Sequence, residues 1–343
     1  MIRYFTTGAH AHRMPLSYPA LAPLVAPFAT RVDRPEQADL HVYAHVLDVM
    51  QAPAAAVQDW RTRRRPVVIL SEEPFWDTLW GRRPLARHRV VDTAHGALPV
   101  VQLNHHTSRI FDFDHIPYYL LTNPRFAAAY GARFARNARV TAPEWRARFA
   151  ARPRQAAFMF ERRPGAFHDL RWPEGDIIGL CAWRTTLAEA CTGRVDRLGQ
   201  SWGRGPSRFA LDNWHLDKLV QLDGRAQMIG AIENTHQPAY LTEKLFDAFA
   251  CGAVPLYFAS PRHRVHDLGL PAGAWINLYG LSPQAAAERV AQGVDAATHE
   301  AYAAAQRQLA ARLGTPRTWL RERTRLARAL QEALTEVAET EAP

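Results

Sequence analysis

The chain has few cysteines: only Cys181, Cys191 and Cys251 occur among its 343 residues. An odd number of cysteines with no CxxC pair offers neither a disulfide framework nor a structural zinc site. This scarcity predicts a protein of a reducing compartment, the cytoplasm.

Long hydrophobic runs are also missing. The first residues, MIRYFTTGAHAHRM, lack the apolar core of a signal peptide, and no segment approaches the length of a transmembrane helix. We therefore expect a soluble protein that is at most peripheral at a membrane.

Acidic residues are in the minority, with 33 Asp and Glu against 42 Lys and Arg and a net charge of +9. Most of the basic residues are Arg, which binds phosphate and carboxylate with two parallel hydrogen bonds. An anionic substrate, an anionic membrane surface or nucleic acid would fit this charge. So would the residue usage of a GC-rich genome, which the many Ala and Pro residues suggest. No RNP, zinc-finger or Gly-rich helicase motif is present, so we expect no nucleic-acid partner.

The length and the 48% hydrophobic content predict two folded domains, because a chain of this size exceeds one typical core. Pro66 to Leu70 is a continuous apolar run, typical of a parallel strand buried on both faces. Strands alternate with helices, which predicts α/β domains. The predicted strands are 2–6, 39–46, 66–70, 88–92 and 99–103 in the first domain, and 156–160, 177–180, 226–231 and 253–258 in the second.

Predicted domain boundaries follow from the same pattern. Residues 1–152 form an N-terminal domain that ends with helices near the hinge Arg152-Pro153-Arg154, and residues 153–315 form a C-terminal domain. Residues 316–343 form a helix with one apolar stripe, which predicts packing at the domain junction. Its Arg-rich half leaves docking to a membrane surface as the lesser alternative. The stripe consists of Trp319, Leu326, Leu330, Leu334 and Val337.

A helix beginning near Thr242 is the most informative local feature. Thr242 is suited to be its N-cap, and Gly252 marks its end. The free N–H groups and the helix dipole favour a phosphate at such an N-terminus, and Lys244 adds a positive charge. The apolar face is Leu245, Phe246, Phe249 and Ala250.

The run that contains this helix, ENTHQPAYLTEKLFDAFACGAVPLYFASP, resembles the donor-binding signature of the α-1,3/4-fucosyltransferases, glycosyltransferase family 10. The resemblance implies a GT-B-like α/β fold, with two Rossmann-like domains facing a cleft. It also implies an inverting enzyme that moves fucose from GDP-fucose to an acceptor glycan. Animal members carry a membrane anchor and lumenal disulfides. This chain resembles the bacterial branch, so we expect surface polysaccharide synthesis, such as lipopolysaccharide O-antigen, in the cytoplasm or at the inner membrane.

The donor residues are carried over from this resemblance. Asn234 and Tyr240 would line the donor pocket, Glu243 would accept from sugar or ribose hydroxyls, and Lys244 would neutralise phosphate. Arg184 resembles the family arginine that grips the diphosphate. An insertion around residues 164–174 leaves other basic residues as alternatives, namely Arg163 and Arg171 and, more weakly, Lys218.

Two acidic residues, Glu72 and Glu73, follow the strand 66–70, where ligands bind in open α/β sheets. The string Ser71-Glu72-Glu73-Pro74 resembles the family's Glu-Ser-Pro element, with Glu73 in the place of Ser. The resemblance implies that Glu72 is the general base that deprotonates the acceptor hydroxyl. Without it, the two acids read as an ordinary strand-to-loop corner.

The segment 104–118 resembles a further family string. It keeps Asn104, Ser108, Asp112, Asp114 and the pair Pro117-Tyr118 but departs at Arg109-Ile110. We expect Asn104 to line the acceptor cleft, and Asp112 and Asp114 either to line it or to be structural. Alone, Asp112 and Asp114 would suggest a metal-binding DxD pair, but two acids need help from phosphate to hold an ion. We therefore expect no obligatory cofactor, with Mg²⁺ or Mn²⁺ as a stimulant at most. The histidine pairs 10/12 and 263/266 are expected at the surface.

Two other functions remain open. One is a transferase of the same fold that uses another nucleotide sugar, because a few pocket contacts decide donor choice. The other is a non-catalytic polyanion-binding protein, which the charge alone supports.

Overall fold

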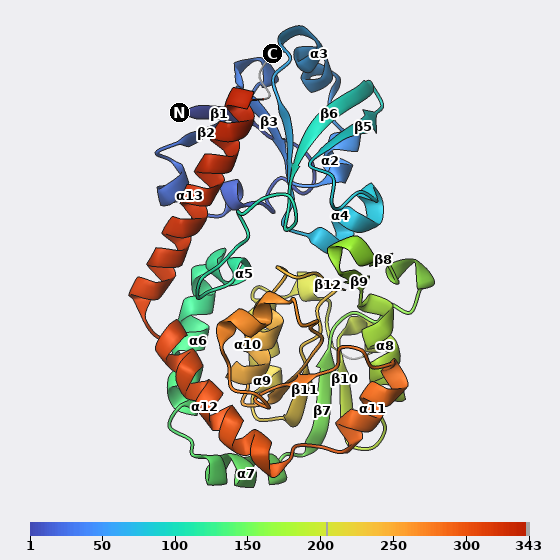
Figure 1. Ribbon diagram of the computed structural model, residues 1–343, viewed down its shortest axis with the longest axis vertical. Coiled ribbons are helices and arrows are strands. Elements are labelled where there is room, and N and C mark those ends of the chain that lie inside the picture. The colour runs from blue at the N-terminus through green and yellow to red at the C-terminus, as the bar shows by residue number, and fades with distance from the viewer. Residues whose placement is uncertain (204, 341–343) are drawn as a thin grey trace. The chain divides into compact units, whose positions relative to one another are not determined.

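The computed structural model describes residues 1–203 and 205–340. The chain folds into two compact units: unit 1 comprises Met1–Pro124 and Trp319–Pro343, and unit 2 comprises Arg125–Thr318. Each unit contains a mainly parallel sheet with helices packed on it (Figure 1). The predicted α/β class is therefore confirmed.

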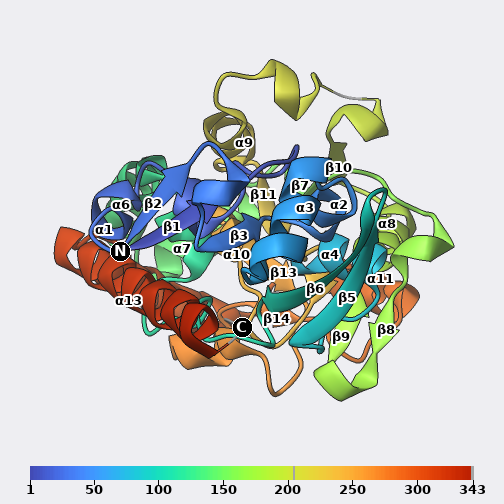
Figure 2. The same ribbon diagram turned by 90° about the horizontal axis from the view of Figure 1, so that it is seen from above.

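Unit 1 is built on a six-stranded sheet with the order β2-β1-β3-β4-β6-β5. All neighbouring strands are parallel except the hairpin formed by β5 and β6, which run side by side at one edge (Figure 2). Every residue of β4 is buried, as the apolar run predicts. The strands are β1 (Ile2–Phe5), β2 (Ala29–Val32), β3 (Leu40–Tyr43), β4 (Val67–Leu70), β5 (His88–Thr93) and β6 (Gly96–Leu103).

The helices of unit 1 include the C-terminal one. The predicted apolar stripe of α13 is buried. The Glu322 carboxylate accepts from the backbone N–H of Asp114 at 3.1 Å, and Arg323 Nε donates to the Leu121 carbonyl at 3.1 Å. Placement at a domain junction stays a prediction. The helices are α1 (Ala22–Val25), α2 (Val46–Met50), α3 (Ala54–Arg63), α4 (Pro74–Gly81), α5 (Tyr118–Leu121) and α13 (Pro316–Thr340).

Unit 2 has a five-stranded, fully parallel sheet with the order β10-β7-β11-β13-β14. The predicted strand 177–180 exists as β9 (Ile177–Gly179) but lies outside this sheet. It pairs antiparallel with β8 (Arg171–Trp172) and β12 (Thr235–His236), because apolarity indicates a strand without choosing its partners. The parallel strands are β7 (Arg154–Met159), β10 (Val195–Leu198), β11 (Ala226–Gly230), β13 (Val254–Tyr257) and β14 (Ile276–Asn277).

The compact units are divided after Pro124, whereas the predicted boundary lies at residue 152. Two helices before residue 152 pack into unit 2: Asn137 Nδ2 donates to the Phe249 carbonyl at 3.0 Å, and the rings of Trp145 and Tyr302 lie edge to face at 4.9 Å. The helices of unit 2 are α6 (Pro124–Asn137), α7 (Ala142–Ala150), α8 (Cys181–Ala190), α9 (Trp214–Leu222), α10 (Glu243–Ala250), α11 (Pro283–Ala291) and α12 (Ala296–Leu313).

Within residues 1–203 and 205–340, no helix is both long and apolar enough to cross a bilayer.

Candidate active site

The N-terminus of α10 forms as predicted. Thr242 is the N-cap, and its Oγ1 accepts from the Lys244 backbone N–H at 3.5 Å. Gly252, just beyond the helix, has φ +71°, the left-handed geometry that favours glycine at a helix end. The segment 231–242 joins the carboxyl end of β11 to this helix. The helix therefore begins at the sheet edge where α/β folds bind ligands.

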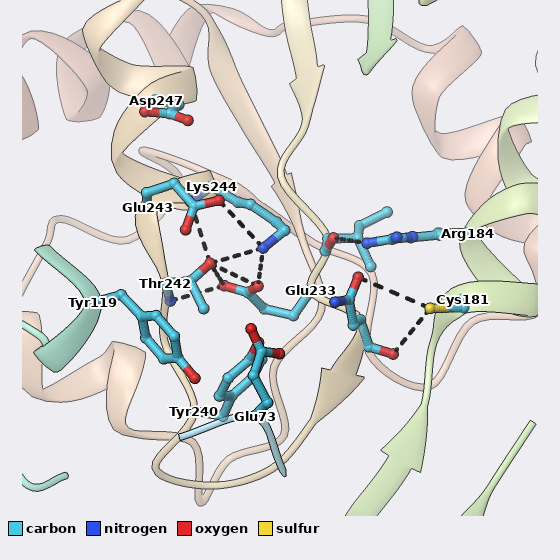
Figure 3. A network of polar contacts seen from close by, with 12 residues as sticks. Glu73, Tyr119, Cys181, Arg184, Glu233, Tyr240, Thr242, Glu243, Lys244 and Asp247 are labelled. Atoms are coloured by element: carbon cyan, nitrogen blue, oxygen red, sulfur yellow. Dashed lines mark hydrogen bonds and ion pairs between the residues drawn. The ribbon is translucent and has the colours of Figure 1, made fainter. Parts of the chain in front are cut away.

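The carboxylate of Glu233 lies against this helix start. It accepts from the Thr242 backbone N–H at 2.9 Å and from Thr242 Oγ1 at 2.7 Å. Lys244 Nζ lies 2.8 Å from the same carboxylate and 2.9 Å from Thr242 Oγ1 (Figure 3). Glu233 is buried, so Lys244 provides the charge that compensates it.

Lys244 is thus a paired cation rather than an isolated surface charge; its side chain is 20% exposed. Burial alone would lower the pKa of Lys244, but the carboxylates of Glu233 and Glu243 outweigh burial and raise it. Burial would likewise raise the pKa of Glu243, but the charges of Lys244 and Lys218 hold it below its usual value. Both side chains are therefore charged at neutral pH.

Arg184 lies close to the same segment. It is 3% exposed, its Nη1 donates to the Ile232 carbonyl at 3.0 Å, and its guanidinium lies 4.6 Å from the centre of the Phe160 ring. Its charge opposes protonation of Lys244, which places the two cations near one another. Its Nε is buried and has no hydrogen-bond partner in the part of the chain that the structure describes.

The two alternatives to Arg184 are placed differently. Arg171 lies in β8 with a largely exposed side chain 3.4 Å from the Asp169 carboxylate. The backbone N–H of Arg163 donates to Thr185 Oγ1 at 2.9 Å. The Arg184 guanidinium bonds to the segment leading into α10.

Asn234 and Tyr240 complete the predicted donor set. The Asn234 carbonyl accepts from the Leu180 backbone N–H at 2.9 Å, which joins it to the start of α8. Tyr240 is buried, and its carbonyl lies 3.1 Å from His263 Nε2. Four of the five predicted donor residues therefore lie at positions 234–244 of unit 2, and the fifth, Arg184 of α8, bonds to the residue Ile232 just before them. Their roles stay predictions. His263 is itself buried, contrary to its expected place at the surface.

Lys218 has a different environment from Lys244. Its Nζ lies 2.7 Å from Asp247 Oδ2, while His215 Nε2 and the Tyr130 hydroxyl bond Oδ1 of the same carboxylate, each at 2.7 Å. Burial would raise the pKa of Asp247, but Lys218 and His215 hold it well below its usual range. This cluster ties α6 and α9 to α10.

We predict that Thr242→Ala lowers the free energy of unfolding by about 1–3 kcal/mol. The substitution removes the cap of α10 and one donor to the buried Glu233 carboxylate. Denaturant titration measures the loss. Thr242→Ser retains the hydroxyl and is the control, so equal stability of the Ala and Ser variants would contradict this role.

In unit 1, Glu72 follows the carboxyl end of β4. It is 2% exposed, and its two oxygens accept from the Tyr18 hydroxyl at 2.6 Å and the Tyr118 hydroxyl at 2.5 Å. Burial raises the pKa of Glu72 to about 7, against the lowering effect of both tyrosine hydroxyls. A carboxylate that titrates near neutral pH is suited to accept a proton during catalysis.

Glu73 has a different environment although it is the next residue. It occupies the N-cap position of α4 and forms an ion pair with Arg13. The Tyr119 hydroxyl bonds the backbone carbonyl of Glu72, which anchors the turn between the strand and the helix.

The three residues expected at the acceptor cleft lie in the loop after β6. The Asn104 side chain holds that loop: Oδ1 accepts from the Thr107 backbone N–H at 3.0 Å, and Nδ2 donates to the Pro84 carbonyl at 2.9 Å. Asp112 Oδ2 accepts from Arg109 Nε at 3.4 Å, and the Asp114 backbone bonds Glu322. A role in binding an acceptor stays a prediction for all three.

Metal-ligating side chains do not cluster in the described residues: no group of three or more His, Cys, Asp or Glu there stands close enough to hold an ion. Stimulation by Mg²⁺ or Mn²⁺ stays a prediction, and phosphate oxygens would have to supply further ligands.

The sequence predicted no role for Tyr18 or Arg13, and it marked Glu233 as part of the fucosyltransferase-like run without a role. Glu233 is the first residue of the fucosyltransferase-like run, so its place in that run could have indicated a role at the site. Tyr118 lies in the Pro117-Tyr118 pair of the second family-like string. Tyr18 is 54 residues from Glu72, and no local pattern connects the two.

No family model matches the chain, and no curated protein matches it. A solved structure of an α1,3-fucosyltransferase with GDP-fucose is similar over 85% of this chain and 77% of that chain, with 12% sequence identity and a TM-score of 0.39.

Proposed function

We propose that the protein is an inverting glycosyltransferase that moves fucose from GDP-fucose to a hydroxyl of an acceptor glycan. The observation that carries the proposal is the arrangement at the start of α10. Arg184 and Lys244 lie there beside a capped helix N-terminus at the carboxyl edge of a parallel sheet. The residues that form it are those of the fucosyltransferase-like run, together with Arg184 from α8.

Nucleoside diphosphates fit this place for physical reasons. The helix N-terminus and two cations favour a doubly charged anion. The buried Nε of Arg184 has no partner within the described residues, and a phosphate oxygen would supply one. Glu243 is kept ionised, so it can accept from sugar or ribose hydroxyls.

In the proposed reaction, Glu72 takes the proton of an acceptor hydroxyl. The oxygen attacks the anomeric carbon of fucose from the face opposite the diphosphate, the bond from that carbon to the phosphate oxygen breaks, and GDP leaves. Lys244, Arg184 and the helix N-terminus stabilise the charge that develops on GDP. No obligatory metal takes part in this scheme. The acceptor is a bacterial surface glycan under assembly in the cytoplasm or at the inner membrane.

The donor assignment predicts a selective thermal shift. A ligand that binds only the folded protein stabilises it by about 2.7 kcal/mol at a concentration of 100 times its Kd. GDP and GDP-fucose should raise the melting temperature, whereas UDP-glucose should leave it unchanged. Equal shifts with UDP-glucose would overturn the choice of GDP-fucose. If none of the nucleotides raised the melting temperature, the proposed transferase function itself would be overturned.

A further inference from the structure

His10 and Asp48 form a hydrogen-bonded pair in unit 1. His10 Nδ1 lies 2.8 Å from Asp48 Oδ1, and the His10 backbone N–H also donates to this carboxylate at 3.3 Å. The Asp48 side chain is 1% exposed and the His10 side chain 33% exposed. His10 is therefore a partly exposed residue, in keeping with its expected place at the surface, and it is held there by a buried carboxylate.

The loop that carries His10 is shaped around Asp48. Gly8 has φ +109°, and a Cβ at this position would stand 2.3 Å from Asp48 Cγ. Only glycine suits that conformation and that close approach. The His45 ring packs on the His10 ring at 4.7 Å. His10 is thus held at its backbone and at its ring.

This pair lies at the same sheet edge as Glu72. His10 follows β1, and His45 follows the neighbouring strand β3. The Arg13 backbone N–H donates to the His10 carbonyl at 2.7 Å, and the Arg13 side chain pairs with Glu73 at the end of β4. Polar residues therefore follow the carboxyl ends of three adjacent parallel strands, with His45 and Glu72 buried and His10 partly exposed.

The chemistry around His10 favours hydroxyl groups. The Asp48 carboxylate accepts from Nδ1–H, which leaves Nε2 of neutral His10 as a hydrogen-bond acceptor. The buried Glu72 carboxylate already accepts from two tyrosine hydroxyls, and Glu73 pairs with Arg13. Nε2 of the partly exposed His10 ring can therefore accept from an O–H donor of a sugar, and the nearby carboxylates disfavour an anionic ligand.

A second pair of the same type offers a matched comparison. His41 Nε2 lies 2.9 Å from Asp59 Oδ2, but the His41 side chain is only 1% exposed. That pair joins β3 to α3 within the core of unit 1. It has the same hydrogen-bond chemistry without access to a ligand.

We propose that His10, positioned by Asp48, binds a hydroxyl group of a neutral, polyhydroxylated acceptor. The substrate class rests on the proposed sugar transfer. The binding contact itself rests on the geometry of the pair and can be measured without turnover.

The test measures binding of lactose, as a neutral sugar, and sialyllactose, as its acidic counterpart, to the full chain with GDP present. His10→Asn retains an amide N–H at the position of Nδ1 and removes Nε2. We expect it to weaken lactose binding by about three- to tenfold, the effect of one hydrogen bond. His41→Gln, which likewise retains the bonded nitrogen, should leave lactose binding unchanged. Neither variant should change the affinity for GDP.

The positioning role of Asp48 has its own readout. In protein with ¹⁵N-labelled histidine, the His10 proton should reside on Nδ1, and Asp48→Asn should shift that tautomer while the fold persists. An unchanged tautomer would contradict positioning by Asp48.

Three outcomes would overturn the proposal. The first is that lactose and other neutral sugars fail to bind while GDP binds, and the second is that sialyllactose binds more tightly than lactose. The third is equal lactose affinity of His10→Asn and wild type. Failure of the wild-type protein to bind GDP would instead overturn the proposed transferase function, so the two failures are distinguishable.

Discussion

Glu72→Gln is expected to reduce sugar transfer by about 10²–10⁴-fold, the usual cost of removing a general base. Glutamine keeps the shape of the side chain: its amide oxygen can accept from one of the two tyrosine hydroxyls, and its amide N–H can donate to the other. It cannot take up a proton. The affinity for GDP should stay unchanged, because the proposed GDP contacts lie in unit 2 and Glu72 lies in unit 1. Transfer assays and calorimetry with GDP on the same preparation measure both quantities.

The pH dependence of transfer provides a second readout of Glu72. Burial raises its pKa to about 7, so the carboxyl stays protonated below that pH and becomes a base above it. The rate of wild-type transfer should therefore rise with pH through about 7 and then level. Glu72→Gln should lack this rise.

The same pKa shift has a consequence for stability. In the unfolded chain a Glu carboxyl titrates near 4.3, about three units below the folded value, so the folded state binds more protons in between. The contribution of Glu72 to stability is fully present below that unfolded pKa, and it is lost as the pH rises through about 7. Denaturant titrations across this range should show a smaller decline in Glu72→Gln than in the wild type.

Glu73→Gln is the control for the register of this motif. Glu73 pairs with Arg13, and in the resemblance it stands where the family has Ser, so its substitution should leave transfer largely intact. If Glu73→Gln abolishes transfer and Glu72→Gln does not, the register is wrong by one residue. If neither substitution matters, the base lies elsewhere, and Asp112 and Asp114 are the next candidates.

Lys244→Met is expected to have two separate effects. It should weaken GDP binding on the order of tenfold or more, because a charge-assisted contact with phosphate is lost. It should also lower the free energy of unfolding by about 3–5 kcal/mol, because Glu233 is left buried without its cation. Calorimetry with GDP measures the first effect and denaturant titration the second.

The double variant Glu233→Gln/Lys244→Met separates these effects. Removing both charges should recover much of the lost stability, since no unpaired buried charge remains. GDP affinity should stay low, because the cation is still absent. Recovery of wild-type GDP affinity in the double variant would show that Lys244 serves only to neutralise Glu233.

Local structure around both candidate sites was predictable from the sequence. The apolar run at residues 66–70 became β4, and Thr242 became the N-cap of α10. Such features depend on neighbouring residues, namely the hydrophobic pattern of a strand or the side chain before a helix. For the same reason, the positions of Glu72 and Lys244 at element ends could be read from the chain alone.

Only the tertiary structure decided which groups these side chains meet. Glu72 accepts from tyrosines 54 and 46 residues away, and Asp48 lies 38 residues from His10. Likewise, α6 and α7 belong to unit 2 through contacts of Asn137 and Trp145 with residues more than 100 positions later. Local patterns carry no record of such pairings, because strand order and long-range packing bring these residues together. The environment that sets the charge state of Glu72 and pairs Lys244 with Glu233 arises only in the folded chain.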